Sequence, residues 1–378
     1  MKNLTQQARQ KLMERAARVR LDGTPQEAFA RILRRHRAVG GAMSIVRGGR
    51  VEATLTYGLA QRETRTPVLT DTVFRCASVS KMVMAMGAMR LCERGLLTLD
   101  GDVGAVFGFS VRNPRFPDTP ITLRQLLTHT AGLSDAGGYA RGQETLKQML
   151  TKAENYLPHA PGTRFAYSNF GAGVAGCLME RAAGERLETL MERLIFAPLG
   201  VHASFAPQCI EKKEQIANGY HVRPLLMPRL AYHAQAVASA PLAAWDWQRD
   251  YYVAPGRMLA TSGALAQLLT LLLSPDGKGI LSPESLAEMR ALQDGRGSVQ
   301  CAGRGLNVAF LDGIYGPGRL CGHQGVAYGM CCEAWGDPSC GDGVVFHTNG
   351  ALLSRGGSLM HVGADALALG FALLGRTR

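Results

Sequence analysis

Sheet-forming segments lie near both ends of this chain, and a long helical segment separates them. Near the amino end, residues 42–47 and 51–57 are apolar-rich runs on either side of Gly48-Gly49, a pattern typical of a β-hairpin. Beyond Met289 the chain returns to short apolar runs between glycines, at residues 305–311, 327–335 and 343–347. We therefore expect one antiparallel sheet that starts with the hairpin and is completed by strands from the far end of the chain.

The segment between these strands carries mainly helical signals, with loops marked by proline and glycine. The expected helices cover residues 81–93, 123–127, 145–153, 171–183, 187–196 and 263–273. A last helix, over residues 364–374, follows the final strand. The sequence predicts an α+β fold in which an antiparallel sheet is flanked by helices and residues 80–274 form an inserted helical lobe.

The net charge of +12 is concentrated at the amino end, where the first 50 residues hold twelve basic and three acidic side chains. Residues 1–38 have apolar positions at helical spacing, interrupted near Gly23 and Pro25, and are expected to form a basic extension of two helices. Such helices can make a weak contact with an anionic surface, although a solvated helix face is the more common outcome. We expect no nucleic-acid partner.

No targeting or membrane segment is expected. Charged and amide residues occupy the amino end where a secretory signal is apolar, and the longest apolar run, residues 265–273, is far shorter than the ~20 residues that span a bilayer. Nine scattered cysteines without a Cys-x-x-Cys pair suit a cytoplasmic protein. A zinc site between Cys321 and Cys340 would need irregular spacing, so buried thiols are favoured and no metal or cofactor is expected.

Ser78 and Lys81 lie three residues apart where an extended stretch, residues 72–76, meets an expected helix. This spacing puts both side chains on one helix face, so the Lys81 amine can reach the Ser78 hydroxyl and accept its proton. The first turn of a helix also favours negative charge that develops there. Alone, the same pattern often marks an ordinary helix cap.

Two further motifs follow along the chain. Tyr167-Ser168-Asn169 precedes a helix, where the tyrosine can exchange a proton and the asparagine amide can hold a substrate carbonyl, or the three residues can form a simple capped turn. His323-Gln324-Gly325 lies on an expected strand with Val326 directly after it. His361 begins a similar short pattern, but two strands and the last helix still follow His323, whereas His361 lies just before that helix.

Taken in order, these motifs resemble those of the penicillin-recognising serine hydrolases, and especially the class C beta-lactamase-like branch of beta-lactamases, D-Ala-D-Ala peptidases, D-aminopeptidases and esterases. The resemblance covers roughly residues 40–375. It includes four flanking or connecting segments, residues 73–81, 121–133, 197–200 and 258–269. It implies a hydrolase domain at 39–378, with a sheet lobe at about 39–79 and 275–378 and a helical lobe at about 80–274.

The resemblance also implies a role for each motif residue. Ser78 is the nucleophile that becomes acylated, and Lys81 with Tyr167 exchanges the protons. Asn169 orients the substrate, while His323, Gln324 and Gly325 stand where most beta-lactamases of this branch carry Lys-Thr-Gly. The backbone amides of Ser78 and Val326 form the oxyanion hole. His129, in a segment that resembles a family loop, is expected to order that loop.

Replacing the lysine of the third motif with His323 removes a permanent positive charge, because histidine is mostly neutral at pH 7. This weakens recognition of a substrate carboxylate there and favours ester, amide or peptide cleavage over efficient beta-lactam turnover. The alternative is a sensor that binds penicillin or peptide without hydrolysis. Six aromatic residues can line a substrate pocket or pack the helical lobe: Tyr220, Tyr232, Trp245, Trp247, Tyr251 and Tyr252.

Overall fold

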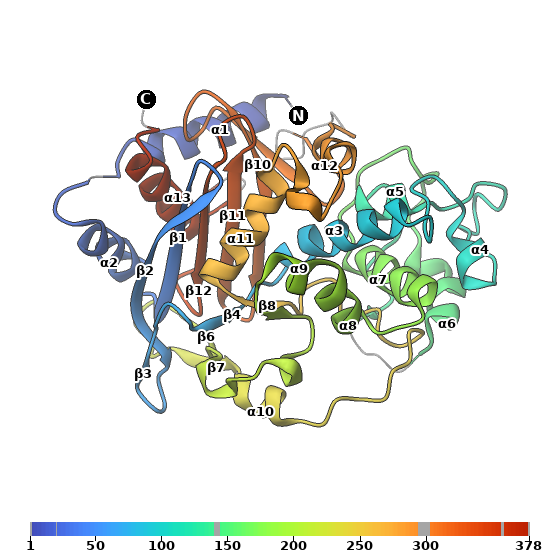
Figure 1. Ribbon diagram of the computed structural model, residues 1–378, viewed down its shortest axis with the longest axis horizontal. Helices are drawn as coiled ribbons and strands as arrows, with labels where there is room; N and C mark the ends of the chain where they lie inside the picture. Colours follow the sequence, from blue (N-terminus) through green and yellow to red (C-terminus); the bar gives the residue numbers. More distant parts are fainter. Residues whose placement is uncertain (1, 20, 140–143, 294–302, 357–358, 377–378) are drawn as a thin grey trace.

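The computed structural model describes residues 2–19, 21–139, 144–293, 303–356 and 359–376 (Figure 1). Its main sheet has seven strands in the spatial order β3, β2, β1, β12, β11, β10, β9, and every described pairing is antiparallel. The strands are β1 (Gly40–Arg47), β2 (Arg50–Gln61), β3 (Thr66–Pro67), β9 (Ala309–Asp312), β10 (Arg319–Ala327), β11 (Met330–Asp337) and β12 (Asp342–Thr348).

The N-terminal hairpin joins the C-terminal strands where β1 pairs with β12; Gly41 pairs with Thr348 there. The predicted hairpin is also present: Arg47 pairs with Arg50, and Gly48 and Gly49 both have positive φ, at 53° and 77°. Two consecutive positive φ values suit a two-residue turn that follows the twist of the strands, which is why glycines occupy it. The predicted α+β fold with an antiparallel sheet is confirmed.

Each face of the sheet is covered by helices (Figure 1). On one face lie α13 (His361–Leu373), α2 (Pro25–Arg35) and α1 (Lys2–Ala16), and on the other lies α11 (Ser262–Leu273). Successive side chains of a strand point to opposite faces of the sheet. Val344 and Phe346 of β12 therefore pack in the apolar core under α13, α2 and α1, and Val345 packs in the core under α11. The sequence analysis placed residues 263–273 in the helical lobe, whereas α11 packs against the sheet.

The basic N-terminal helices pack on this sheet. Arg15 of α1 forms an ion pair of 2.5 Å with the buried Asp365 of α13, and Arg35 lies 3.7 Å from the same carboxylate. His36 also contacts Asp365, at 2.8 Å. Part of the N-terminal charge is therefore compensated inside the fold.

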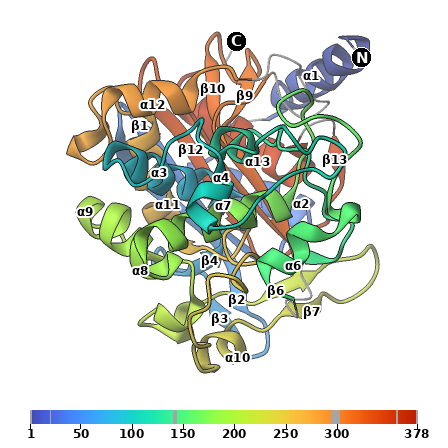
Figure 2. The same cartoon turned by 90° about the vertical axis from the view of Figure 1, so that its right-hand side faces the viewer.

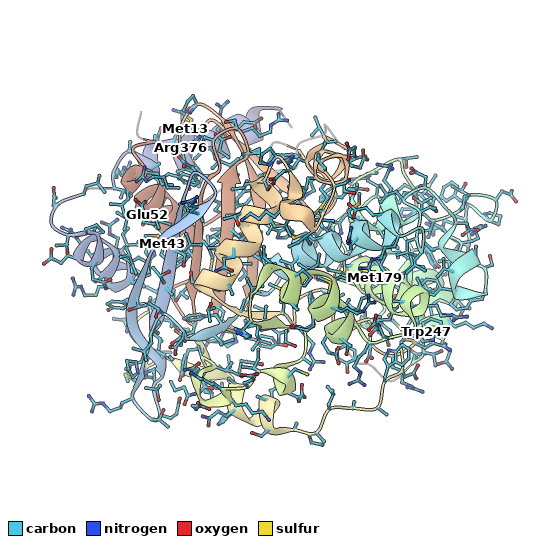
Figure 3. The ribbon with its side chains drawn as sticks, viewed as in Figure 1. Met13, Met43, Glu52, Met179, Trp247 and Arg376 are labelled. Carbon is cyan, nitrogen blue, oxygen red and sulfur yellow. The ribbon has the colours of Figure 1, made fainter. Side chains whose placement is uncertain are left out.

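The remaining helices form a second lobe beside the sheet (Figure 2). They are α3 (Val79–Glu93), α4 (Val103–Phe107), α5 (Leu123–Leu127), α6 (Leu146–Thr151), α7 (Asn169–Ala183), α8 (Leu187–Met191), α9 (Ala197–Leu199), α10 (Ala234–Ser239) and α12 (Pro283–Arg290). Figure 3 shows Met179 of α7 in this lobe and Met43 of β1 in the sheet; both side chains are fully buried. Met179 belongs to the apolar core that the helical lobe shares with α11, and Met43 belongs to the core under α13.

Short strands also occur outside the main sheet, and the sequence analysis predicted an extended segment only at the first of them. They are β4 (Val73–Arg75), β5 (Ala203–Ser204), β6 (Gly219–His221), β7 (Arg229–Tyr232), β8 (Leu259–Thr261), β13 (Arg355–Gly356) and β14 (Leu359–Met360). β4 pairs with β8, which places the segment before Ser78 beside the segment before α11. Among the described residues, no helix combines the length and apolar character needed to cross a membrane.

Candidate active site

Ser78 lies directly before α3, at a sharp turn that follows β4. Ala77 has a φ of +47°, a conformation that costs a non-glycine residue of order 1 kcal/mol. The Ser78 side chain makes no capping hydrogen bond to the helix, unlike an ordinary N-cap serine. Its hydroxyl instead faces a cavity and is available for chemistry.

Lys81 lies one turn further along α3, and its side chain is fully buried. Its Nζ donates to Ser78 Oγ at 3.2 Å, to Asn169 Oδ1 at 2.9 Å and to the Pro255 carbonyl oxygen at 2.6 Å. All three of these partners are neutral acceptors, and no carboxylate of the described residues forms an ion pair with Lys81. The amine is positioned to exchange a proton with Ser78.

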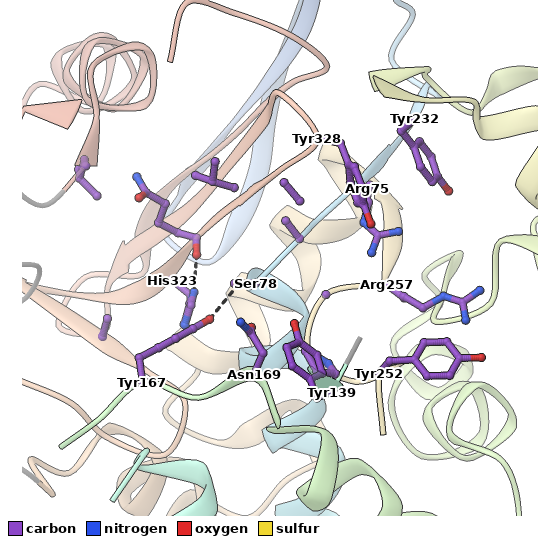
Figure 4. Close-up of a pocket in the computed structure, with 18 of the residues that line it drawn as sticks. Arg75, Ser78, Tyr139, Tyr167, Asn169, Tyr232, Tyr252, Arg257, His323 and Tyr328 are labelled. Atoms are coloured by element: carbon purple, nitrogen blue, oxygen red, sulfur yellow. Dashed lines mark hydrogen bonds between the residues drawn. The ribbon is translucent and has the colours of Figure 1, made fainter. Parts of the chain in front are cut away.

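Tyr167 lies two residues before α7, and its side chain contacts the Ser78 hydroxyl. Its Oη donates to Ser78 Oγ at 2.9 Å (Figure 4). His129 packs against the tyrosine with ring centroids 4.4 Å apart, and its Nδ1 accepts from the Ser168 backbone amide at 3.3 Å. His129 therefore supports the tyrosine loop, and it does not contact Ser78 directly in any described hydrogen bond.

Asn169 is held by a residue that the sequence analysis missed. Asp135 accepts hydrogen bonds from Asn169 Nδ2 at 2.9 Å, from Ser168 Oγ at 3.0 Å and from the backbone amides of Asn169 and Phe170 at 3.1 and 2.9 Å. A carboxylate at the start of α7 also suits the helix dipole. With Oδ1 bound to Lys81 and one N–H bound to Asp135, the Asn169 amide keeps one N–H for a substrate.

Replacing Asp135 with alanine is expected to lower kcat by about tenfold to a hundredfold, because Asn169 and Lys81 lose the anchor that fixes their positions. The variant is also expected to lose about 1–2 kcal/mol of stability, since the first amides of α7 lose their acceptor. Steady-state kinetics and urea unfolding measure the two effects. Unchanged kcat in a destabilised protein would show that Asp135 serves only the fold.

The third motif lies on β10, on the sheet side of Ser78. A Cβ added to Gly325 would lie 2.3 Å from the Cys76 carbonyl oxygen and 2.9 Å from the Ser78 backbone nitrogen. Only glycine allows this close approach, which brings the part of β10 that leads into Val326 against the turn at Ala77 and Ser78. The Gln324 side chain donates to the buried Glu333 on β11, so its amide is turned toward the sheet, although the residue lines the cavity.

His323 is buried and carries no charge at ordinary pH. Its Nδ1 donates to the Gln324 carbonyl oxygen at 2.6 Å, and its Nε2 has no hydrogen-bond partner among the described residues. Burial, together with the positive charges of Arg304 and Lys81, lowers the pKa of His323 to about 3. The third motif therefore supplies a neutral acceptor where a lysine would supply a cation.

Replacing His323 with glutamine is expected to reduce the loss of stability at acid pH. Between about pH 6.5, the pKa of an unfolded histidine, and pH 3, the unfolded chain protonates this side chain and the folded protein does not, so stability falls as pH falls. This difference amounts to about 2 kcal/mol at pH 5. Urea unfolding at pH 7 and pH 5 measures it, and equal declines for both proteins would contradict the assignment.

A cavity of about 720 Å³ opens beside Ser78 between the two lobes. Of the six aromatic residues considered from sequence, Tyr232 and Tyr252 line it. The others do not: Tyr220 and Tyr251 are buried, Trp247 stacks on Phe107 with ring centroids 5.5 Å apart, and Trp245 is partly exposed. Some of these six aromatic residues therefore line the cavity, and others pack in the interior, as the two alternatives from sequence allowed.

Three potential metal ligands lie close together, and one of them, Cys76, is two residues before Ser78. Cys76, Cys332 and His347 are buried, and their ligand atoms lie within 4.8 Å of one another. Only Cys332 comes from the Cys321–Cys340 segment considered from sequence; Cys340 is exposed, and every described cysteine is free. Hydrogen bonds from Cys332 and His347 outweigh burial and lower the pKa of Cys76 to about 6.

A serine hydroxyl bonded to both a lysine amine and a tyrosine hydroxyl, at a helix start beside a cavity, defines a serine hydrolase. Comparison with known proteins identifies the family to which the chain belongs. The Beta-lactamase family model matches residues 8–364, and the chain belongs to this family.

Individual relatives agree with this assignment. The chain is 28% identical to Esterase EstB of Burkholderia gladioli over 90% of this chain and 93% of that protein. It is 28% identical to Penicillin-binding protein 4 of Amycolatopsis lactamdurans, over 88% and 84% of the two chains. Among solved structures, the hydrolase EstCE1, which has promiscuous acyltransferase activity, superposes with a TM-score of 0.70 at 25% identity, covering 97% and 99% of the chains.

Proposed function

We propose that this protein hydrolyses an ester or amide through an acyl-enzyme on Ser78. The observation that carries the proposal is the pair of hydrogen bonds to Ser78 Oγ, from Lys81 at 3.2 Å and from Tyr167 at 2.9 Å. The remaining motif residues, Asn169, His323, Gln324 and Gly325, surround or support the same cavity. A pure binding protein would have no need for two proton-exchanging groups on one hydroxyl.

In the acylation step, Ser78 Oγ attacks the substrate carbonyl carbon, and its proton passes to Tyr167 in its phenolate form, either directly or by relay through Lys81. The carbonyl oxygen becomes negative and is bound by the backbone amides of Ser78 and Val326, at the positive end of α3. The C–O or C–N bond then breaks, and Tyr167 donates a proton to the leaving group. Asn169 fixes Lys81 and offers its free N–H to the acyl group.

In the deacylation step, water attacks the acyl-enzyme carbonyl from the open side of the cavity. Tyr167 accepts the water proton, and the proton returns to Ser78 Oγ as the ester bond to the enzyme breaks. The partial exposure of Tyr167, at 38%, supports this role because water can reach its hydroxyl. The cycle consumes one water and releases an alcohol or amine and an acid, with no cofactor.

Neutral His323 supports an ester or amide substrate over a beta-lactam. Beta-lactam antibiotics carry a carboxylate beside the ring, and an uncharged histidine in the third motif offers it no ion pair. The esterase name of a relative that covers nearly the whole chain points the same way. The free state of all described cysteines supports a cytoplasmic location, and the N-terminal helices would add at most a weak contact with an anionic surface.

The test compares hydrolysis of a short-chain p-nitrophenyl ester with hydrolysis of a chromogenic cephalosporin by the purified protein. We expect kcat/KM for the ester to exceed that for the cephalosporin by at least about a hundredfold, the effect of losing one or two charged hydrogen bonds. Faster cephalosporin turnover would assign a beta-lactamase instead. Stable binding of labelled penicillin without turnover of either substrate would favour the sensor.

A further inference from the structure

The cavity beside Ser78 is lined by positively charged side chains. Four arginines line it, Arg75, Arg257, Arg304 and Arg355, and none of the described lining residues is an aspartate or a glutamate. His323 is neutral, so the motif at residues 323–325 does not contribute to the positive charge of the cavity. A cavity lined by cations without carboxylates attracts an anionic ligand.

Arg75 and Arg257 lie on the same side of Ser78, away from Tyr167 and His323 (Figure 4). The Arg75 guanidinium lies 5.4 Å from the Tyr232 ring centroid and 5.2 Å from that of Tyr328. The Arg257 guanidinium lies 5.4 Å from the Tyr252 ring centroid. Aromatic rings against the guanidinium faces leave the N–H edges for a planar partner such as a carboxylate.

Neither arginine forms a close ion pair within the described part of the chain, and the Asp250 carboxylate acts on Arg257 only at longer range. No ion pair involves Arg75 or Arg257 there, and the buried Nε of Arg75 has no hydrogen-bond partner. The Tyr232 hydroxyl lies beside Arg75 and interacts with its guanidinium. Burial lowers the pKa of Arg75 and the charge of Arg257 lowers it further, although the two tyrosines act in the opposite direction.

Two like charges held in a half-buried wall are costly unless an anion binds between them. An arginine stays charged at any ordinary pH, so deprotonation does not relieve that cost. A substrate carboxylate would compensate both charges and satisfy the free donors. Because these groups lie in the cavity that contains Ser78, the carboxylate would belong to the molecule that is hydrolysed.

The position of Tyr167 decides which part of the substrate carries this carboxylate. Tyr167 donates to Ser78 Oγ and, in the proposed mechanism, protonates the leaving group, which therefore lies on the Tyr167 side. The acyl group extends to the other side of Ser78, toward Arg75 and Arg257 (Figure 4). We propose that the substrate is an ester or amide whose acyl group carries a second carboxylate, such as a half-ester of a dicarboxylic acid, and that Arg75 and Arg257 bind this carboxylate.

This inference rests on the proposed function for the orientation of the substrate, but its test does not need turnover. In the Ser78→Ala protein, binding of the p-nitrophenyl monoester of adipic acid is measured by calorimetry and compared with that of its methyl ester, which is neutral. The acid is expected to bind at least about tenfold more tightly, the effect of one charge-assisted hydrogen-bond pair. Adding Arg75→Met, or separately Arg257→Met, is expected to bring the ratio of the two affinities close to one.

Arg319→Met is the matched control, because Arg319 pairs with Asp312 at 2.8 Å and does not line the cavity. It is expected to leave the ratio unchanged. Equal affinities of the acid and its methyl ester would overturn the inference, as would a ratio that survives both Arg75→Met and Arg257→Met. A preference for 4-acetoxybenzoate over its methyl ester, larger than the preference for the adipate, would place the carboxylate in the leaving group and also overturn it.

The two proposals fail in different ways. If the wild-type protein hydrolyses neutral esters through Ser78 but shows no preference for the acid, the function stands and the acyl-carboxylate site is wrong. If the Ser78→Ala protein binds the acid tightly through Arg75 and Arg257 but the wild type hydrolyses neither ester, the binding site stands and the hydrolytic function is wrong.

Discussion

Replacing Ser78 with alanine is expected to reduce kcat/KM for p-nitrophenyl ester hydrolysis by about 10⁴-fold or more, the effect of losing the nucleophile of a covalent mechanism. Lys81 and Tyr167 would remain in place but would have no hydroxyl to activate. The small activity left would come from the oxyanion hole and substrate binding alone. The measurement is initial-rate kinetics on purified wild type and variant at equal concentration.

The fold should tolerate this change well. The Ser78 hydroxyl bonds only to Lys81 and Tyr167 among the described hydrogen bonds, and it does not cap α3. We expect the melting temperature to change by no more than a few degrees. A folded Ser78→Ala protein with undiminished activity would exclude Ser78 as the nucleophile.

Replacing Lys81 with methionine is expected to lower kcat by about 10²–10⁴-fold, the usual effect of removing a general acid or base. Methionine keeps an unbranched chain of similar length in this buried position and removes only the amine. Its loss leaves Asn169 Oδ1 and the Pro255 carbonyl oxygen without their donor, so the free Asn169 amide should also lose its fixed orientation. Single-turnover kinetics measures the acylation step directly.

Lys278→Met is a matched control for this variant. The Lys278 amine is also partly buried and donates to Thr270 Oγ1 at 2.6 Å, but it lies outside the cavity. We expect it to lower stability slightly and to leave kcat close to the wild-type value. Equal losses of kcat in both variants would show that Lys81 acts through the fold and would contradict its proposed proton transfer.

The fold was predictable from sequence because its evidence is local and repeated along the chain. The Gly48-Gly49 turn, the helix around Lys81 and the short apolar runs between glycines after Met289 can each be recognised within a few consecutive residues. The exception is α11, whose all-round apolar sequence suits either lobe. Only the pairing of β1 with β12, and the sheet face that this pairing creates, assigns the helix to the sheet.

The site was predictable only where its residues form short motifs. Ser78 and Lys81 are one helical turn apart, and Tyr167 and Asn169 flank a helix start, so sequence spacing reports their geometry. Asp135 lies in a loop 34 residues before Asn169 and has no periodic neighbour that would single it out. Arg257 is far from Ser78 in the sequence but lines the same cavity, and only tertiary folding brings the two residues together.

The central claim is that Ser78 forms a covalent acyl-enzyme. The most direct test is to mix the protein with a p-nitrophenyl ester, quench with acid within the first turnovers, digest, and locate the added acyl mass by tandem mass spectrometry. Our account predicts the acyl group on Ser78, with no acyl-peptide in the Ser78→Ala protein. Acylation of another residue, or rapid hydrolysis without any acylated peptide, would contradict it.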